Sequence, residues 1–396
     1  MKLSHRALRM EPSATLAVTG KAKALAAQGK NVISFGAGEP DFASPPSALE
    51  AAREAMVQGK THYTASSGIP ELKKAIAAYY QERFGLTYAP KQILVGAGAK
   101  PLLYEALGCL VNPGDEVLVP APAWVSYLEQ IRLFEGNPVV VETASSAYLP
   151  TLEALEKAIT PRTVGLLLNS PCNPTGQVYG EDLLRGIGAL AERHDLWIIW
   201  DEIYERLVYG DAHHVNPLEL LPDLAPRVLL INGVSKAFAM TGWRIGYALG
   251  PEALVSKMDE FQGHLTSNAC SVAQWASLGA LHGAEEDVVR MHTAFAARRE
   301  LMMARLRSMP YISFPEPRGA FYILVDVRSC LGRQSATRTL ADDSAFCEAL
   351  LEEELVAAVP GSAFLAPGHL RLSYANATEE ITEGMNRLER FLKALR

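Results

Sequence analysis

Residues 234–246 read Val-Ser-Lys-Ala-Phe-Ala-Met-Thr-Gly-Trp-Arg-Ile-Gly. The stretch follows the apolar run Val-Leu-Leu-Ile at 228–231 and leads into Ile-Gly-Tyr-Ala-Leu at 245–249. Both runs are typical of buried strands bounded by polar residues or glycine. We therefore expect Lys236 to lie on a connection at a strand end, where the sheets of α/β proteins bind their ligands.

Lys236 and Arg244 bring two cations close together along the chain. No Asp or Glu lies between Lys236 and Gly250. A phosphate suits the planar fork of an arginine, and a neighbouring positive charge with partial burial lowers the pKa of a lysine toward a nucleophilic amine. The pair indicates an anion site beside a Schiff-base lysine. The alternative is a surface lysine and an arginine that packs its stem on Trp243.

Composition excludes several classes of protein. The chain has 396 residues, 49% of them hydrophobic, and a net charge of −7, which is ordinary for a globular protein and argues against a nucleic-acid surface. The five cysteines form no Cys-x-x-Cys pair, so we expect no metal site. Neither a signal peptide nor an apolar run of the roughly 20 residues that span a membrane is present. We expect a cytoplasmic protein.

Apolar runs alternate with helical patterns along most of the chain. The strand-like runs begin at Ile93, Glu116, Pro138, Thr163, Trp197 and Val228. Amphipathic segments such as 183–193 separate them. This alternation predicts an α/β fold with a large, mostly parallel sheet and helices on both faces.

The last part of the chain has a different pattern. Residues 251 to about 309 are helical throughout, and strand patterns at 319–325, 356–360 and 369–374 then mix with helices at 344–354 and from 379. We predict a large domain at 41–309 and a small α+β domain at 310–396. An N-terminal segment at 1–40 is expected to pack with the small domain.

Three predicted strands end on polar residues. Leu168 leads to Asn169-Ser-Pro-Cys-Asn173, Trp200 leads to Asp201, and Asn232 leads to Lys236. A carboxylate at the end of an apolar strand is costly unless it has a cationic partner. Asp201 is therefore a candidate for a shared site, although it could also pair with Arg206 or cap the next helix.

The predicted strand at 93–95 runs into Gly-Ala-Gly-Ala-Lys-Pro at 96–101. A strand, a glycine loop and a helix N-terminus can hold an anion with backbone N–H groups and the helix dipole. Pro101 stands where a dinucleotide fingerprint needs its third glycine, and the loop is not a Walker loop either. The signal alone is weak.

Several motifs in the same order resemble one known family. They are Pro12-Ser-Ala-Thr, Ala37-Gly-Glu-Pro-Asp-Phe, Gly68-Ile-Pro-Glu-Leu, Trp124-Val-Ser-Tyr, Asn169-Ser-Pro-Cys-Asn-Pro-Thr-Gly, Asp201-Glu-Ile-Tyr, Ser235-Lys-Ala-Phe-Ala-Met-Thr-Gly-Trp-Arg-Ile-Gly-Tyr and Arg371-Leu-Ser-Tyr-Ala. The chain resembles the class I aminotransferases of the fold type I pyridoxal-phosphate superfamily, nearest to the bacterial aspartate aminotransferase subgroup Ib. The resemblance runs nearly end to end.

The resemblance implies a role for each reactive residue. Lys236 would form a Schiff base with pyridoxal phosphate and then shuttle the proton of the substrate Cα. Asp201 would pair with the ring nitrogen, and Asn173 and Tyr204 would hydrogen-bond the phenolic oxygen of the ring. Trp124 would stack on the ring face and border the substrate.

The resemblance also implies the anion contacts. The phosphate would lie against Gly98, Ala99, Lys100 and Arg244, with Tyr63 reaching it from the other subunit of a homodimer. Arg371 would bind the substrate α-carboxylate as a bidentate pair. Asn173 and the backbone of Gly38 would assist it, and Lys100 would lie near the distal carboxylate of aspartate or glutamate.

Some residues depart from the family pattern. Gly233 stands where many relatives place a Ser or Thr on the phosphate, so that contact could be absent or supplied elsewhere. Glu11 stands where relatives often carry Lys, and it would repel a second carboxylate, including the side-chain carboxylate of prephenate. His264 and Leu265 replace the Gln-Ser usual in the subgroup.

We expect an aminotransferase that exchanges the amino group between an L-amino acid, with aspartate the leading candidate, and 2-oxoglutarate by a ping-pong mechanism. The alternatives are the same chemistry on an aromatic, alanine-like or specialised substrate, and a β-elimination lyase. A non-catalytic cofactor-binding protein on the same fold is the contrasting class.

Overall fold

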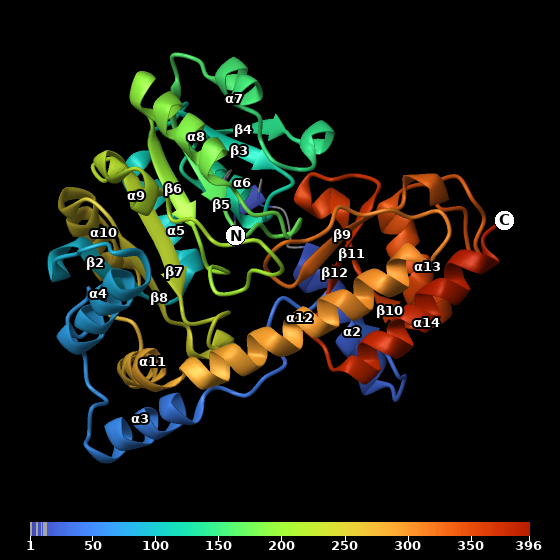
Figure 1. Cartoon of the computed structure of the whole chain (residues 1–396), viewed down its shortest axis with the longest axis horizontal. Helices are drawn as coiled ribbons and strands as arrows, with labels where there is room; N and C mark the ends of the chain where they lie inside the picture. Colours follow the sequence, from blue (N-terminus) through green and yellow to red (C-terminus); the bar gives the residue numbers. More distant parts are fainter. Residues whose placement is uncertain (1, 5–6, 9, 11–13) are drawn as a thin grey trace.

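The computed structural model describes residues 2–4, 7–8, 10 and 14–396. A seven-stranded sheet dominates it, with the strand order β2-β8-β7-β6-β5-β3-β4 (Figure 1). The strands are β2 (Ile93–Gly96), β3 (Glu116–Ala121), β4 (Asn137–Glu142), β5 (Thr163–Asn169), β6 (Trp197–Asp201), β7 (Val228–Gly233) and β8 (Gly246–Leu249). In this sheet β8 alone runs in the direction opposite to the other strands, which confirms the mostly parallel sheet.

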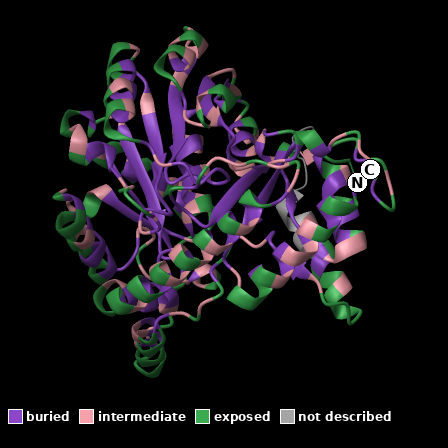
Figure 2. Cartoon of the chain, turned by 45° about the vertical axis from the view of Figure 1, so that its right-hand side comes forward, coloured by how far each residue is buried: buried purple, intermediate pink, exposed green. Residues whose placement is uncertain are grey.

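Helices cover both faces of the sheet, and Figure 2 shows its strands buried between them. One face carries α4 (Pro70–Phe84), α8 (Glu181–Arg193) and α11 (Ser271–Gly283), with α3 (Pro46–Val57) packed on α11. The other face carries α5 (Ala99–Leu110), α6 (Ser126–Leu133) and α10 (Glu252–Leu265). Shorter elements are α7 (Leu152–Ala158), α9 (Pro217–Leu220) and the 3-10 turns Pro90–Gln92, Ala144–Ser146, Pro222–Leu224 and Thr241–Trp243.

The central strands read as continuous apolar runs because both of their faces are buried. In β5, Leu166 and Leu168 belong to the core under α8, and Leu167 between them belongs to the core under α5. The same alternation holds in β6, where Trp200 and Ile199 face opposite layers. Two-sided burial of this kind is typical of parallel sheets.

The C-terminal part forms two small sheets beside the large one. The antiparallel order is β11 (Val359–Pro360), β12 (His369–Ser373) and β9 (Tyr322–Asp326), and β1 (Ile33–Ser34) pairs in parallel with β10 (Val356–Ala357). The helices are α2 (Ala14–Ala27), α12 (Glu285–Arg307), α13 (Asp343–Glu354) and α14 (Thr378–Ala394), with 3-10 turns at Arg328–Cys330 and Gly361–Phe364. In Figure 1, α12 runs from beside α11 to α14.

The predicted single strand at 356–360 is wrong in one respect. It is divided into β10 and β11, because Val356 and Ala357 pair with β1 whereas Val359 and Pro360 pair with β12. The predicted domain boundaries at 40 and 309 stay predictions.

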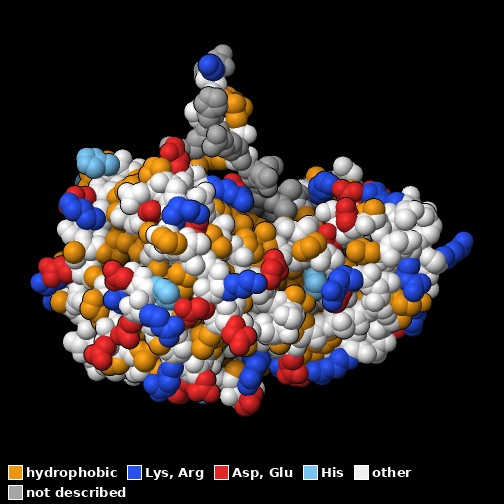
Figure 3. All heavy atoms as spheres, turned by 90° about the horizontal axis from the view of Figure 1, so that it is seen from above, with side chains coloured by type: hydrophobic (Ala, Val, Ile, Leu, Met, Phe, Trp, Pro, Cys, Tyr) orange, Lys and Arg blue, Asp and Glu red, His pale blue; other side chains and the backbone are white. Residues whose placement is uncertain are grey.

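The surface and the helices add two observations. On the face shown in Figure 3, basic and acidic side chains are interspersed. Among the described helices, none has the length and apolar character needed to cross a membrane.

Candidate active site

A cavity of about 290 Å³ lies at the carboxyl ends of β5, β6 and β7. Its lining contains the predicted residues Gly38, Ala99, Lys100, Trp124, Asn173, Asp201, Tyr204, Lys236, Arg244 and Arg371. It also contains Tyr127, Asn169, Ile203, Ser235, Thr241 and Tyr322, which were not predicted as site residues. Strand ends, a helix N-terminus and the C-terminal sheet therefore all contribute to one cavity.

Lys236 follows β7 and directs its amine into the cavity. Its Nζ donates a hydrogen bond to the backbone carbonyl of Gly38. Burial above all, together with the charges of Arg371 and Arg244, lowers the pKa of Lys236 to about 8 against the opposing effect of Glu39 and Asp201. An amine with this pKa is partly neutral at physiological pH and can act as a nucleophile.

Asp201 ends β6 as a buried carboxylate that forms no ion pair with any described residue. Its side chain is held by the Tyr127 hydroxyl, which donates to Oδ2 at 2.6 Å, and by the Ile203 N–H, which donates to Oδ1 at 3.2 Å. Burial raises the pKa of Asp201 to about 6. The alternative partner Arg206 instead pairs with Glu285. A buried carboxylate of this kind suits a cationic N–H group on a ligand.

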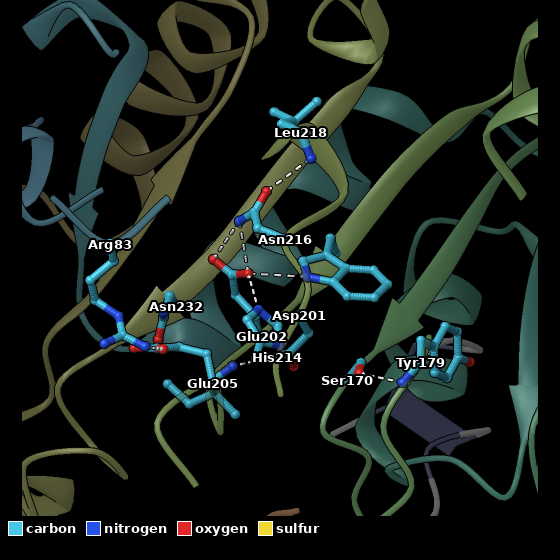
Figure 4. A network of polar contacts seen from close by, with 12 residues as sticks. Arg83, Ser170, Tyr179, Asp201, Glu202, Glu205, His214, Asn216, Leu218 and Asn232 are labelled. Carbon is cyan, nitrogen blue, oxygen red and sulfur yellow. Dashed lines mark hydrogen bonds and ion pairs between the residues drawn. The ribbon is translucent and has the colours of Figure 1, made fainter. Parts of the chain in front are cut away.

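Glu202, the next residue, does not line the cavity and holds the end of β6 through a separate hydrogen-bond network (Figure 4). It is fully buried and accepts hydrogen bonds from Tyr80 (2.6 Å), His214 Nε2 (2.9 Å), Asn216 (3.0 Å) and Trp200 Nε1 (3.1 Å). Carboxylates are buried at low cost only when hydrogen bonds replace their hydration. This network therefore holds the backbone that carries Asp201.

Two asparagines, Asn169 at the end of β5 and Asn173 after it, connect the strand ends to the cavity. Asn169 donates from Nδ2 to the backbone carbonyl of Asp201 at 2.9 Å, and its Oδ1 accepts from the Asn173 N–H at 2.9 Å. Asn173 Oδ1 in turn accepts from Arg371 Nη1 at 3.0 Å. Asn169 therefore sets the position of Asn173 relative to Asp201.

Arg371 is a buried guanidinium that forms no ion pair with any described residue. It lies in β12, is 2% exposed, and donates to Asn173 Oδ1 and to the backbone carbonyl of Gly36, each at 3.0 Å. Its Nε is buried without a hydrogen-bond partner in the structure, and burial lowers its pKa. A carboxylate on a ligand would satisfy both the charge and the remaining N–H groups.

The first turn of α5 and Arg244 form a second cationic corner. Gly98 has φ +107°, and a Cβ at this position would lie 2.5 Å from Arg244 Nη2, so only glycine lets the guanidinium approach the helix N-terminus. A Cβ on Gly246 would lie 2.4 Å from Ala99 N, so α5 begins directly over β8. Backbone N–H groups at a helix N-terminus beside an arginine can bind a phosphate.

Gly233 has a steric reason to depart from the family pattern. A Cβ there would lie 2.8 Å from the carbonyl oxygen of Ile245, and β7 and β8 are paired at this point. Ser235, two residues later in the chain, carries a hydroxyl and lines the cavity.

Lys100 and Trp124 lie together on the wall of the cavity. Lys100 Nζ is 4.6 Å from the centre of the Trp124 ring, and burial followed by the charge of Arg244 lowers the pKa of Lys100. Trp124 packs edge-on against Tyr127 at 5.4 Å. This corner offers an aromatic face and a cation to a ligand.

The remaining predicted residues lie outside the cavity of their own chain. Gly98 caps α5 without lining the cavity, Tyr63 is 90% exposed, and His264 and Leu265 lie at the exposed end of α10. Glu11 lies outside the described residues. Sequence reasoning missed Tyr127 and Tyr322, although the quoted motif Trp124-Val-Ser-Tyr ends on Tyr127.

Known proteins match the whole chain. The family "Aminotransferase class I and II" matches residues 30–388. The aspartate/prephenate aminotransferase of Cereibacter sphaeroides is 46% identical over 99% of each chain, and the aspartate aminotransferase of Geobacillus stearothermophilus is 44% identical over 100% of each.

Solved structures agree with these matches. The aspartate aminotransferase of Thermus thermophilus with maleate is 40% identical with a TM-score of 0.93, over 99% of this chain and 100% of that one. The Rhizobium meliloti aspartate aminotransferase is 40% identical with a TM-score of 0.96, over 100% of both chains. Because the family match and its relatives extend over almost the whole sequence, the chain belongs to the class I and II aminotransferases, and the protein is an aminotransferase.

Proposed function

We propose that the protein binds pyridoxal phosphate and exchanges the amino group between L-aspartate and 2-oxoglutarate by a ping-pong mechanism. One observation carries this proposal. A cavity of about 290 Å³ contains a half-buried lysine of lowered pKa, a buried carboxylate and a buried arginine, and neither of the last two forms an ion pair with a described residue. These three groups match an aldehyde, a ring N–H and a substrate carboxylate respectively.

The residues of the cavity fit the cofactor from end to end. The N-terminus of α5 with Arg244 and Ser235 would hold the phosphate, and Asp201 would hold the ring nitrogen. Asn173 and Tyr204 would hydrogen-bond the phenolic oxygen, and Trp124 would cover the ring face. When bound, pyridoxal phosphate supplies an electrophilic carbon for an amine and an electron sink for the carbanion at the substrate Cα.

The protein's own groups bind the substrate and move its proton. Arg371 binds the α-carboxylate through its free N–H groups and so orients the Cα–H bond. Lys236, once displaced by the substrate, would move the proton between the substrate Cα and the C4′ carbon of pyridoxal phosphate. Its lowered pKa suits both directions of this transfer. Asp201 would hold the N–H group of the ring.

A dicarboxylic substrate is favoured by the lysine beside Trp124. Lys100 lines the cavity together with Lys236. Its Nζ lies beside the Trp124 ring, and burial lowers its pKa. A distal carboxylate would neutralise it. Similar proteins support this choice, since they include aspartate and aspartate/prephenate aminotransferases.

A homodimer explains the position of Tyr63. This tyrosine is 90% exposed and lies outside the cavity of its own chain. Tyrosines are enriched at interfaces because they bury a large ring and keep a polar hydroxyl. We propose that it reaches the phosphate site of the second subunit, so that two chains complete each site.

The test is a half-reaction without an oxo acid. The cofactor-loaded protein is mixed with aspartate, glutamate, alanine or phenylalanine, and the visible spectrum and released products are followed. Aspartate is expected to convert the cofactor to its amino form once and to release one oxaloacetate per site. Conversion by phenylalanine or alanine alone would assign another substrate, and sustained pyruvate release would assign a β-lyase.

A further inference from the structure

Tyr322 is a buried cavity residue that contacts both the large sheet's site residues and those of the C-terminal sheet. It begins β9, opposite Ser373 of β12, and is 1% exposed. Its hydroxyl lies 3.0 Å from the hydroxyl of Tyr204, which belongs to the segment after β6. Its ring lies 4.3 Å from the guanidinium carbon of Arg371. Tyr322 therefore connects the substrate arginine to the residue proposed to bind the ring oxygen.

The packing leaves Tyr322 little freedom. A Cβ built on Gly38 would lie 3.3 Å from the Tyr322 hydroxyl. The Gly38 backbone, whose carbonyl accepts a hydrogen bond from Lys236, therefore packs against this oxygen. The Phe321 ring lies next to it with centres 4.7 Å apart, and Tyr204 packs edge-on at 5.9 Å. A hydroxyl confined in this way has a fixed partner in Tyr204.

The direction of the hydrogen bond follows from proton counting. A phenol has one proton to donate and can accept from another donor. Burial raises the pKa of Tyr204 well above its usual value, so this hydroxyl keeps its proton. If Tyr204 gives that proton to the phenolic oxygen of the cofactor, the short contact between the two tyrosines requires Tyr322 to be the donor.

We propose that Tyr322 is a positioning residue for amino transfer, whose hydroxyl donates to Tyr204 and whose ring supports the guanidinium of Arg371. Its donation aims the Tyr204 proton at the ring oxygen and strengthens that hydrogen bond, because hydrogen bonds in a chain polarise one another. This inference rests on the proposed function, since it assumes the cofactor that Tyr204 would contact.

The test measures the pH at which the visible absorption of the cofactor-loaded protein changes. The hydrogen bond from Tyr204 stabilises negative charge on the ring oxygen, so a weaker bond leaves that oxygen more basic and raises the midpoint. Tyr322→Phe keeps the ring and removes the hydroxyl, and we expect it to raise the midpoint by about 0.5 pH unit. Tyr374→Phe is the matched control, because that buried hydroxyl donates to Ala320 O, away from the cavity.

A second variant separates positioning from a structural effect. If Tyr322 acts through Tyr204, Tyr322→Phe should cause no further shift in a Tyr204→Phe background. A shift of equal size in both backgrounds, or identical midpoints for wild type and Tyr322→Phe, would overturn the proposal. Far-UV circular dichroism and Tm establish that each variant is folded, and pyridoxal phosphate titration of the cofactor-free variants gives a readout that does not depend on turnover.

The ring is tested with a carboxylate ligand. Maleate binding to the loaded protein should be nearly unchanged in Tyr322→Phe and about fivefold weaker in Tyr322→Leu, which loses the aromatic face beneath Arg371. Equal maleate affinity in both variants would contradict the support of Arg371 by the ring. A wild-type protein that gains no visible absorption band when pyridoxal phosphate is added would instead overturn the proposed cofactor and function.

Discussion

Asp201 and Glu202 are adjacent in sequence, yet their carboxylates lie on opposite sides of the β6 end. Asp201 lines the cavity and accepts from Tyr127, whereas Glu202 is enclosed in the hydrogen-bond network of Figure 4. Strand geometry causes this division, because successive side chains point to opposite faces. One carboxylate is available to a ligand, and the other holds the strand in place.

The Glu202 network predicts a loss of stability on a near-isosteric change. Glu202→Gln replaces one acceptor oxygen with a donor NH2 group that faces N–H and O–H donors, so we expect the free energy of unfolding to fall by about 2 kcal/mol. Urea denaturation of the cofactor-free protein measures the change. Glu219→Gln, at an exposed position of α9, is the control and should change stability very little. Equal stability of Glu202→Gln and wild type would contradict the role of the network.

We predict that the contribution of Asp201 to folding stability depends on pH. Its pKa of about 6 in the folded, cofactor-free protein lies above the usual 3.8, so between these values the folded state binds more protons than the unfolded state. The contribution of Asp201 therefore falls as pH rises through this window. Asp201→Asn lacks this dependence, and its stability relative to wild type should increase by up to about 3 kcal/mol between pH 4 and pH 7. A difference that stays constant over this range would show that Asp201 is not perturbed.

Lys236 predicts a pH dependence of cofactor capture. The neutral amine attacks the aldehyde, and burial lowers the pKa of Lys236 to about 8. The second-order rate constant for pyridoxal phosphate binding should therefore rise about tenfold per pH unit below this value and level off above it. Stopped-flow absorbance from pH 6.5 to 9.5 measures the profile. A rise that continues unchanged up to pH 9.5 would indicate an ordinary surface lysine.

We predict that a change at Arg371 weakens the use of aspartate and leaves cofactor binding nearly unchanged. Arg371→Lys removes the planar fork that would bind the α-carboxylate, so kcat/KM for aspartate should fall by at least about 100-fold. The dissociation constant of pyridoxal phosphate should remain within a few-fold of wild type. Arg328→Lys is the control, because Arg328 pairs with Asp326 on the surface of the same C-terminal part. Loss of cofactor affinity without loss of aspartate specificity would assign Arg371 to the cofactor.

The sequence was most informative about the large sheet. Two-sided burial gives β5, β6 and β7 continuous apolar runs, and the polar residues that follow them, Asn169, Asp201 and Lys236, meet at one edge because parallel strands end together. These positions follow from the residues alone. Arg371 does not, because it lies inside a strand whose pattern shows only burial, and only the family resemblance identified it.

Other features depend on tertiary contacts that the local pattern does not contain. Tyr127 and Tyr322 have the pattern of core aromatics, and their hydroxyls acquire a role only through Asp201 and Tyr204. Arg206 is close to Asp201 in sequence but points to Glu285, which lies 79 residues away. The division of 356–360 into β10 and β11 depends on two different partner strands.

The central claim is that Lys236 is the residue that binds the cofactor covalently. Borohydride reduction of the loaded protein, followed by proteolysis and mass spectrometry of the peptides, tests it directly. The account predicts a single phosphopyridoxyl group on Lys236. Modification of Lys100 or Lys73, the other described lysines whose pKa is lowered by burial, or the absence of any modified lysine, would contradict it.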